Sequence, residues 1–151
     1  MIKNKKGVTL IELIMVTAIV SIMLGLAVIN YQSYTKRSNI EADARYILAA
    51  ANLAKQYSFT RKEHLKIHMK DDRTFEILDT NNRVYNSMDH RTKTKMANDP
   101  SGYIEIRNGF VEKEGVIRTL EGENRAEYDC VVFETNRIKA GKYRNGECNA
   151  R

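Results

Sequence analysis

One long run of apolar residues, Val8 to Ile29, occupies the first part of the chain. At ~1.5 Å per residue, a helix over this run would be roughly 33 Å long, enough to cross the hydrocarbon core of a bilayer. The run holds one charged residue, Glu12, and follows Gly7 and three lysines at positions 3, 5 and 6. The pattern predicts a transmembrane helix over residues 8–30, with the lysines on the cytoplasmic side and the rest of the chain outside.

Residues 31–60 are expected to continue the helix as an amphipathic segment. There is no glycine or proline between residues 36 and 58. Apolar residues recur there at three- and four-residue spacing: Ile40, Ala44, Ile47, Leu48, Ala51 and Ala54. This spacing places them on one face of a helix, which should pack on a folded domain.

Residues 61–151 change to the two-residue alternation that is typical of strands. Six strands are predicted, over residues 64–70, 74–78, 103–107, 116–120, 128–134 and 137–143. Turns are predicted at 79–82, 108–109, 121–124 and 140–141, and residues 88–99 are interpreted as a polar surface loop. The predicted fold class is α+β: a long N-terminal α-helix, transmembrane in its first half, packed on an antiparallel β-sheet domain.

The segment Gly7-Val-Thr-Leu-Ile-Glu12, with its basic head and long apolar run, resembles the N-terminus of type IV prepilins. The resemblance implies a pilin-like fold and a leader peptide, residues 1–7, that prepilin peptidase removes after Gly7. It also implies methylation of the new amine on Val8. Cleavage there would leave the hydrophobic helix on the mature chain, unlike an ordinary signal peptide.

Glu12 is costly in this setting, because a charged carboxylate at the centre of a membrane helix costs ~2.5–3.5 kcal/mol on insertion scales. In the pilin family the matching glutamate pairs with the N-terminus of a neighbouring subunit and sets the register of assembly. Glu12 is therefore expected to serve assembly. The alternative is a carboxyl that reaches the membrane interface without a specific partner.

The stretch from Ile40 to Lys55 narrows the resemblance to a group of minor pilins that includes the H-type pseudopilin of type II secretion. This implies a structural subunit that first resides in the bacterial inner membrane and then enters a periplasmic pseudopilus or a cell-surface pilus. The implied partners are other pilin or pseudopilin subunits, prepilin peptidase and an inner-membrane assembly platform. A major pilin is the alternative within the same class.

Cys130 and Cys148 lie on the side of the membrane that is predicted to be outside. In an oxidising compartment they should form one disulfide, worth ~3 kcal/mol in the chain-entropy model. A metal site is the alternative, but two cysteines without nearby histidines make a poor ligand set. Pilins often close their C-terminal region with such a bond.

The formal net charge is +6, and loss of the three leader lysines leaves +3, so bulk charge does not favour nucleic-acid binding. A local basic cluster remains as a candidate DNA-binding site: Arg137, Lys139, Lys142 and Arg144. It is similar to a Gly-Arg-x-Arg element of pilins that take up DNA, although the glycine is missing here. The other interpretation is a solvated strand face that keeps the subunit soluble.

The sequence offers no catalytic residues and predicts no enzyme, no cofactor and no metal site. His64 and His68 are four residues apart, which would suit a shared metal on a helix. On the predicted strand they instead share a polar face with Lys66 and Lys70, which would repel a cation. We interpret both histidines as solvated strand residues.

Overall fold

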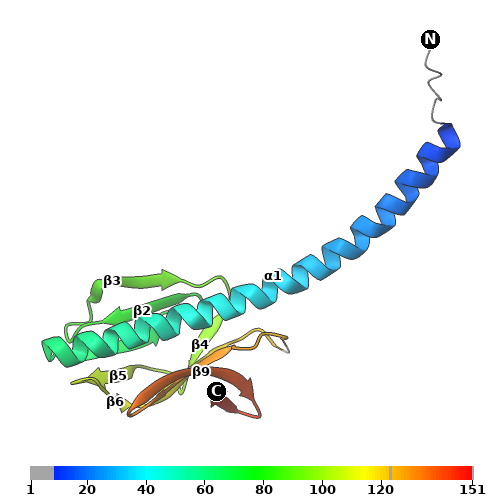
Figure 1. The fold of residues 1–151 in the computed structure, drawn as a ribbon. Helices are drawn as coiled ribbons and strands as arrows, with labels where there is room; N and C mark the ends of the chain where they lie inside the picture. Colours follow the sequence, from blue (N-terminus) through cyan, green and yellow to red (C-terminus); the bar gives the residue numbers. More distant parts are fainter. Residues whose placement is uncertain (1–8, 123, 151) are drawn as a thin grey trace, which may run out of the picture. The chain divides into compact units, whose positions relative to one another are not determined.

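The computed structural model describes residues 9–122 and 124–150, with the backbone alone for residues 26–30. Within these residues, one helix precedes ten strands (Figure 1). The helix, α1, runs over Leu10–Arg61. The chain divides into two compact units, Met1–Lys36 and Arg37–Arg151, and α1 contributes to both.

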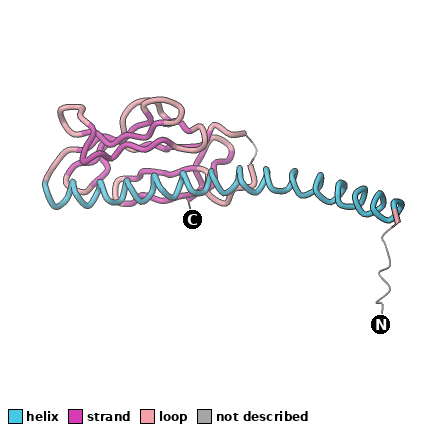
Figure 2. The backbone as a smooth tube through the Cα atoms, turned by 90° about the horizontal axis from the view of Figure 1, so that it is seen from above, coloured by secondary structure: helices cyan, strands magenta, loops and turns pink. Residues whose placement is uncertain are grey.

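The second unit contains two antiparallel sheets of five strands each, and the strands lie along the second half of α1 (Figure 2). The first sheet has the order β3-β2-β1-β5-β6 and consists of β1 (Leu65–Met69), β2 (Thr74–Leu78), β3 (Val84–Arg91), β5 (Ile104–Arg107) and β6 (Phe110–Lys113). The second has the order β10-β9-β8-β7-β4 and consists of β4 (Met96–Asp99), β7 (Gly115–Thr119), β8 (Cys130–Glu134), β9 (Arg137–Arg144) and β10 (Glu147–Ala150).

Both sheets and the helix share one hydrophobic core. The helix contributes five side chains with no exposed surface, at alternating spacings of four and three residues: Ile40, Ala44, Ile47, Ala51 and Ala54. The first sheet adds Ile67 and Phe75, and the second adds Val131 and Phe133, all fully buried. The small alanines among the helical residues allow the backbone of α1 to approach the strands closely.

The C-terminal end of α1 is hydrogen-bonded to the turn between β5 and β6. Lys62 adopts a positive φ of 58°, which ends the helix. The buried hydroxyl of Ser58 donates to the carbonyl of Glu63 at 2.7 Å and accepts from the amide of Gly109 at 3.3 Å. Gly109 has a φ of +82°, and a Cβ there would lie 2.8 Å from the Cβ of Phe59, so the turn requires glycine.

The α+β class, the long helix and the six predicted strands are confirmed, but the strands form two sheets. The predicted loop at 88–99 is too long: residues 88–91 form the end of β3 and 96–99 form β4, so only residues 92–95 lie between strands. The predicted turn at 140–141 is also wrong, because both residues lie inside β9.

Candidate assembly site

The first turn of α1 is held by a capping box. Thr9 precedes the helix, and its hydroxyl accepts a hydrogen bond from the amide of Glu12 at 3.3 Å. In return, the Glu12 carboxylate accepts from the Thr9 amide at 2.9 Å and from the Thr9 hydroxyl at 3.0 Å. Both bonds use Oε2 of Glu12. The pair satisfies backbone donors that would otherwise lack partners at the start of the helix.

This cap was not among the predicted features, although its signal is present in the sequence. A threonine followed three residues later by a glutamate, just before an apolar run, is the usual sequence signature of a capping box. Glu12 therefore has a local structural role in the single chain. Gly7 and Val8, the predicted cleavage and methylation positions, lie outside the described residues.

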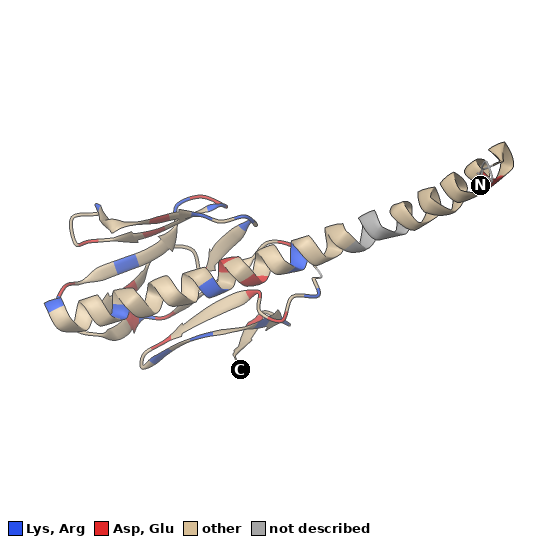
Figure 3. Ribbon diagram, turned by 45° about the horizontal axis from the view of Figure 1, so that its top comes forward, with Lys and Arg blue, Asp and Glu red and all other residues tan. Residues whose placement is uncertain are grey.

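The helix after this cap exposes apolar side chains in every direction. Eleven of them, between Leu10 and Leu24, are 46% to 77% exposed. Glu12 is the one charged residue between Val8 and Thr35, whereas the Arg37–Arg151 unit carries charges of both signs (Figure 3). A helix that is apolar on all sides is stable only when something else surrounds it.

Among the described residues, no helix is both long enough and apolar enough to cross a membrane.

The predicted disulfide is present between Cys130 in β8 and Cys148 in β10. These strands flank β9, so the bond crosses over β9 and joins two strands that are not neighbours in the sheet. The crossing point has a glycine, Gly141, where a Cβ would collide with the backbone of Asn149 and Ala150 in β10. Glycine in β9 thus lets β10 lie close enough for the crosslink.

The basic residues of the candidate DNA-binding site do not form one surface. Because side chains alternate along a strand, Arg137 and Lys139 lie on one face of β9, and Lys142 and Arg144 on the other. Arg137 forms an ion pair with Glu134. Lys142 contacts the buried carboxylate of Asp129 at 2.6 Å. Two of the four cations are therefore already neutralised by a carboxylate.

A polar cavity of about 720 Å³ lies beside the second pair of these cations. Arg118 and Arg125 line it together with Lys142 and Arg144. Arg118 pairs with Asp99 at 3.3 Å and lies over the ring of Tyr143. The strand pattern could not reveal this grouping, because Arg118 and Arg125 are distant from β9 in sequence.

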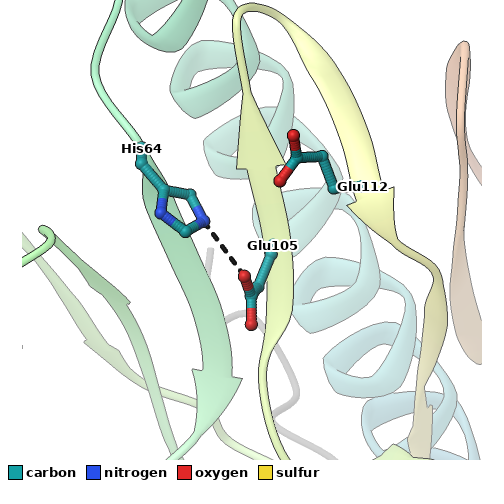
Figure 4. Close-up of side chains that lie close together, drawn as sticks. All are labelled: His64, Glu105 and Glu112. Carbon is teal, nitrogen blue, oxygen red and sulfur yellow. Dashed lines mark hydrogen bonds and ion pairs between the residues drawn. The ribbon is translucent and has the colours of Figure 1, made fainter.

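His64 has surroundings that its strand neighbours do not predict. Its Nε2 lies 3.1 Å from Oε2 of Glu105, and Glu112 approaches from the next strand (Figure 4). His68, by contrast, lies 3.7 Å from Glu76, which is bound by Lys70 at 2.9 Å. The two histidines thus have separate carboxylate partners, which the sequence could not place.

Comparison with known proteins identifies the N-terminal segment. Residues 2–28 match the family model described as "Prokaryotic N-terminal methylation motif". Two proteins of Pseudomonas aeruginosa, each described as "Fimbrial protein", are 22% identical to this chain over 151 residues, covering 97% of both chains. No solved structure gives a significant match.

A methylation motif on a long helix, followed by antiparallel sheets and a C-terminal disulfide, defines a type IV pilin-like protein. The similarity to the fimbrial proteins of Pseudomonas aeruginosa extends over the full length, so the chain as a whole, and not its N-terminal segment alone, is pilin-like. Pilins are structural proteins, and members of this class assemble with other pilin subunits in a filament.

Proposed function

We propose that this chain is a minor subunit of a type IV pilus or of a type II secretion pseudopilus. Prepilin peptidase cuts it after Gly7, the new amine of Val8 is methylated, and an inner-membrane platform inserts the helix into a filament. The single observation that carries this proposal is the ring of exposed apolar side chains on α1 between Leu10 and Leu24. In a filament, the helices of other subunits would bury this surface.

Glu12 is the residue that we propose sets the register of assembly. Its described hydrogen bonds to Thr9 use Oε2 and leave Oε1 to accept from the α-amine of a neighbouring subunit. An ion pair formed between helices, away from water, is stronger than one at an exposed surface. Before assembly, the same apolar segment would reside in the inner membrane.

Mass spectrometry of filaments sheared from the source cells tests this function. A methylated Val8 N-terminus at low abundance is expected for a minor subunit. The same N-terminus in the dominant protein would identify a major pilin instead. An intact Met1 in all copies would refute processing.

The role of Glu12 is tested with Glu12→Gln, because glutamine keeps the capping box but removes the charge. We expect normal cleavage and a loss of filament incorporation, measured by immunoblotting of sheared filaments. The matched control is Glu147→Gln, at an exposed carboxylate of β10, which should enter filaments normally. Normal incorporation of Glu12→Gln would remove Glu12 from the assembly mechanism.

DNA binding is a second candidate function, and the cavity lined by Arg118, Arg125, Lys142 and Arg144 favours it. Cations that contact phosphates give binding that weakens steeply as salt increases. A salt titration with the full chain in detergent would compare Arg125→Ala/Arg144→Ala with Arg137→Ala/Lys139→Ala. A lower salt slope in the first pair alone would assign DNA to the cavity, and unchanged binding in both would exclude these residues.

A further inference from the structure

Three neighbouring strands bring one histidine and two glutamates together on the face of the first sheet that is opposite the core. His64 immediately precedes β1, Glu105 lies in β5, and Glu112 lies in β6. In the sheet order, β5 is between β1 and β6. Among the residues that the structure describes, this is the one group of three potential metal-ligating side chains of this kind.

A β-bulge in β6 creates the grouping. Glu105 pairs with Lys113 and Ile106 pairs with Val111, so Glu112 is an extra residue between the two pairs. Val111 is buried in the core, whereas Glu112 and Lys113 are both exposed. The bulge therefore turns two consecutive side chains to the outer face, where Glu112 meets the histidine.

We propose that His64, Glu105 and Glu112 form a binding site for Zn²⁺. One imidazole nitrogen and two carboxylate oxygens are a ligand set that zinc accepts, and water would complete the coordination. One ligand atom from each residue lies within 4.8 Å of the others, and the His64–Glu105 pair is already at 3.1 Å (Figure 4). Ligands of a tetrahedral zinc ion lie about 3.4 Å apart. The side chain of Glu112 is 43% exposed, so it can make the remaining shift by rotation.

Arg107 is the group that competes with the metal. Its guanidinium lies 3.4 Å from Nδ1 of His64 and 3.5 Å from a carboxylate oxygen of Glu112. Both contacts are long, and the side chains of Arg107 and Glu112 are 49% and 43% exposed. An ion pair at this exposure contributes little, so zinc can displace it, with Nδ1 of His64 then carrying the ring proton.

The nearby lysines are directed to other groups. Lys66, which pairs with Glu105 across the strands, donates from Nζ to Oδ1 of Asn82 at 3.1 Å. The Nζ of Lys113 lies 3.7 Å from the place where a Cβ of Gly102 would be. Neither ammonium group forms a hydrogen bond with the two glutamates in the described structure, so Arg107 is the main electrostatic competitor.

The test is isothermal titration calorimetry, with ZnCl₂ added to the tag-free full-length chain in detergent. Thermal unfolding with and without zinc accompanies it. We expect one zinc per chain and a higher Tm with zinc. His64→Asn and Glu112→Gln should each weaken binding at least about tenfold, a loss of about 1.4 kcal/mol or more. The matched control is His68→Asn, on the same face of the first sheet, which should bind zinc as the unmodified chain does.

Arg107→Gln gives a second test with the opposite sign. Removal of the competing cation should tighten zinc binding, a result that misfolding would not produce. Absence of saturable binding, equal loss in the His68 control, or weaker binding by Arg107→Gln would each overturn the proposal. None of these measurements depends on filament assembly, so the zinc site and the pilin function are tested separately.

Discussion

The two halves of helix α1 are both rich in apolar residues, yet only one half is covered within the chain. Between Leu10 and Leu24 the large apolar side chains point in all directions and are 46% to 77% exposed. Between Ile40 and Ala54 they lie at spacings of three and four residues, and those on the core face have no exposed surface. One half of the helix is thus buried by its own domain, and the other half is left exposed in the single chain.

The difference shows that the spacing of apolar residues along a helix indicates whether the chain's own domain or other molecules cover them. A helix with one apolar stripe is amphipathic, and its own domain can cover that stripe while the polar face stays in water. A helix that is apolar on every side needs partners all around it, which one small β domain cannot supply. Substitutions of the same chemical type should therefore have opposite consequences in the two halves.

The largest expected effect comes from Ile47→Ala compared with Ile14→Ala. Ile47 is fully buried, so its truncation should lower the free energy of unfolding of the globular unit by about 2–5 kcal/mol. Ile14 is 57% exposed in the single chain, and its truncation should change that stability by less than about 0.5 kcal/mol. Denaturant unfolding in detergent, followed by near-ultraviolet circular dichroism, measures both.

Ile14→Ala is expected to reduce the amount of this subunit in filaments, although the globular unit stays folded. Equal destabilisation of the globular unit by both variants would contradict the distinction between the two halves.

The next effect concerns the covalent bond of the sheet domain. Replacing both cysteines, Cys130→Ser with Cys148→Ser, should cost the domain about 2–4 kcal/mol because the unfolded chain gains freedom. The helix before Lys36 has no part in this bond and should keep its helical content. Denaturant unfolding and hydrogen exchange along the chain separate these outcomes. Loss of protection confined to the first unit would contradict the prediction.

A smaller effect is expected from Asp43, which ties the covered half of α1 to the segment between β3 and β4. Its buried carboxylate accepts from the amide of Lys93 at 3.1 Å, and from the amide and the hydroxyl of Thr94 at 2.7 Å each. Asp43→Ala leaves the buried amide and hydroxyl of Thr94 without this partner, which should cost about 1–3 kcal/mol. Asn52→Ala, at an exposed position of α1, is the control and should be nearly neutral in the same unfolding experiment.

The smallest effect is a pH dependence within the sheet domain. Burial lowers the pKa of His68, and this outweighs the opposing attraction of Glu76, while Lys70 lowers the pKa further. The unfolded chain therefore binds a proton more readily than the folded one, so stability should fall as pH drops below about 6.5.

Unfolding measured between pH 7.5 and 5.5 tests this, with His68→Asn as the comparison. The variant should lose less stability on acidification than the unmodified chain. An identical pH dependence in both chains would show that His68 is not the group that responds.

The six strands that the sequence predicts are the interior strands of the two sheets, and the four that it misses are the edges. β3, β6, β4 and β10 each have one strand neighbour only. β3 exposes most of its residues, and its pairing with β2 shifts register near Asn86 and Ser87, which have positive φ values. Edge strands favour polar residues and bulges, so their alternation is too weak to be read from the sequence. This explains why the strand residues within 88–99 were taken for part of a loop.

The candidate sites divide in a similar way. The disulfide could be predicted because the chain has only two cysteines, and the methylation motif because it is a short sequence pattern. The carboxylates around His64 could not, because Glu105 and Glu112 reach it through strand pairing and a bulge that the sequence pattern does not specify. The capping box of Thr9 and Glu12 is local and was readable from four consecutive residues.

The bond between Cys130 and Cys148 also determines how the sheet domain responds to mechanical force. An edge strand such as β10 ordinarily peels from its neighbour one hydrogen bond at a time when its end is pulled. Here the tension bypasses β9 and passes through a covalent link to β8, a strand in the interior of the sheet. A load applied to the chain after Cys148 is therefore transmitted to β8 without first peeling the rest of β10 from β9.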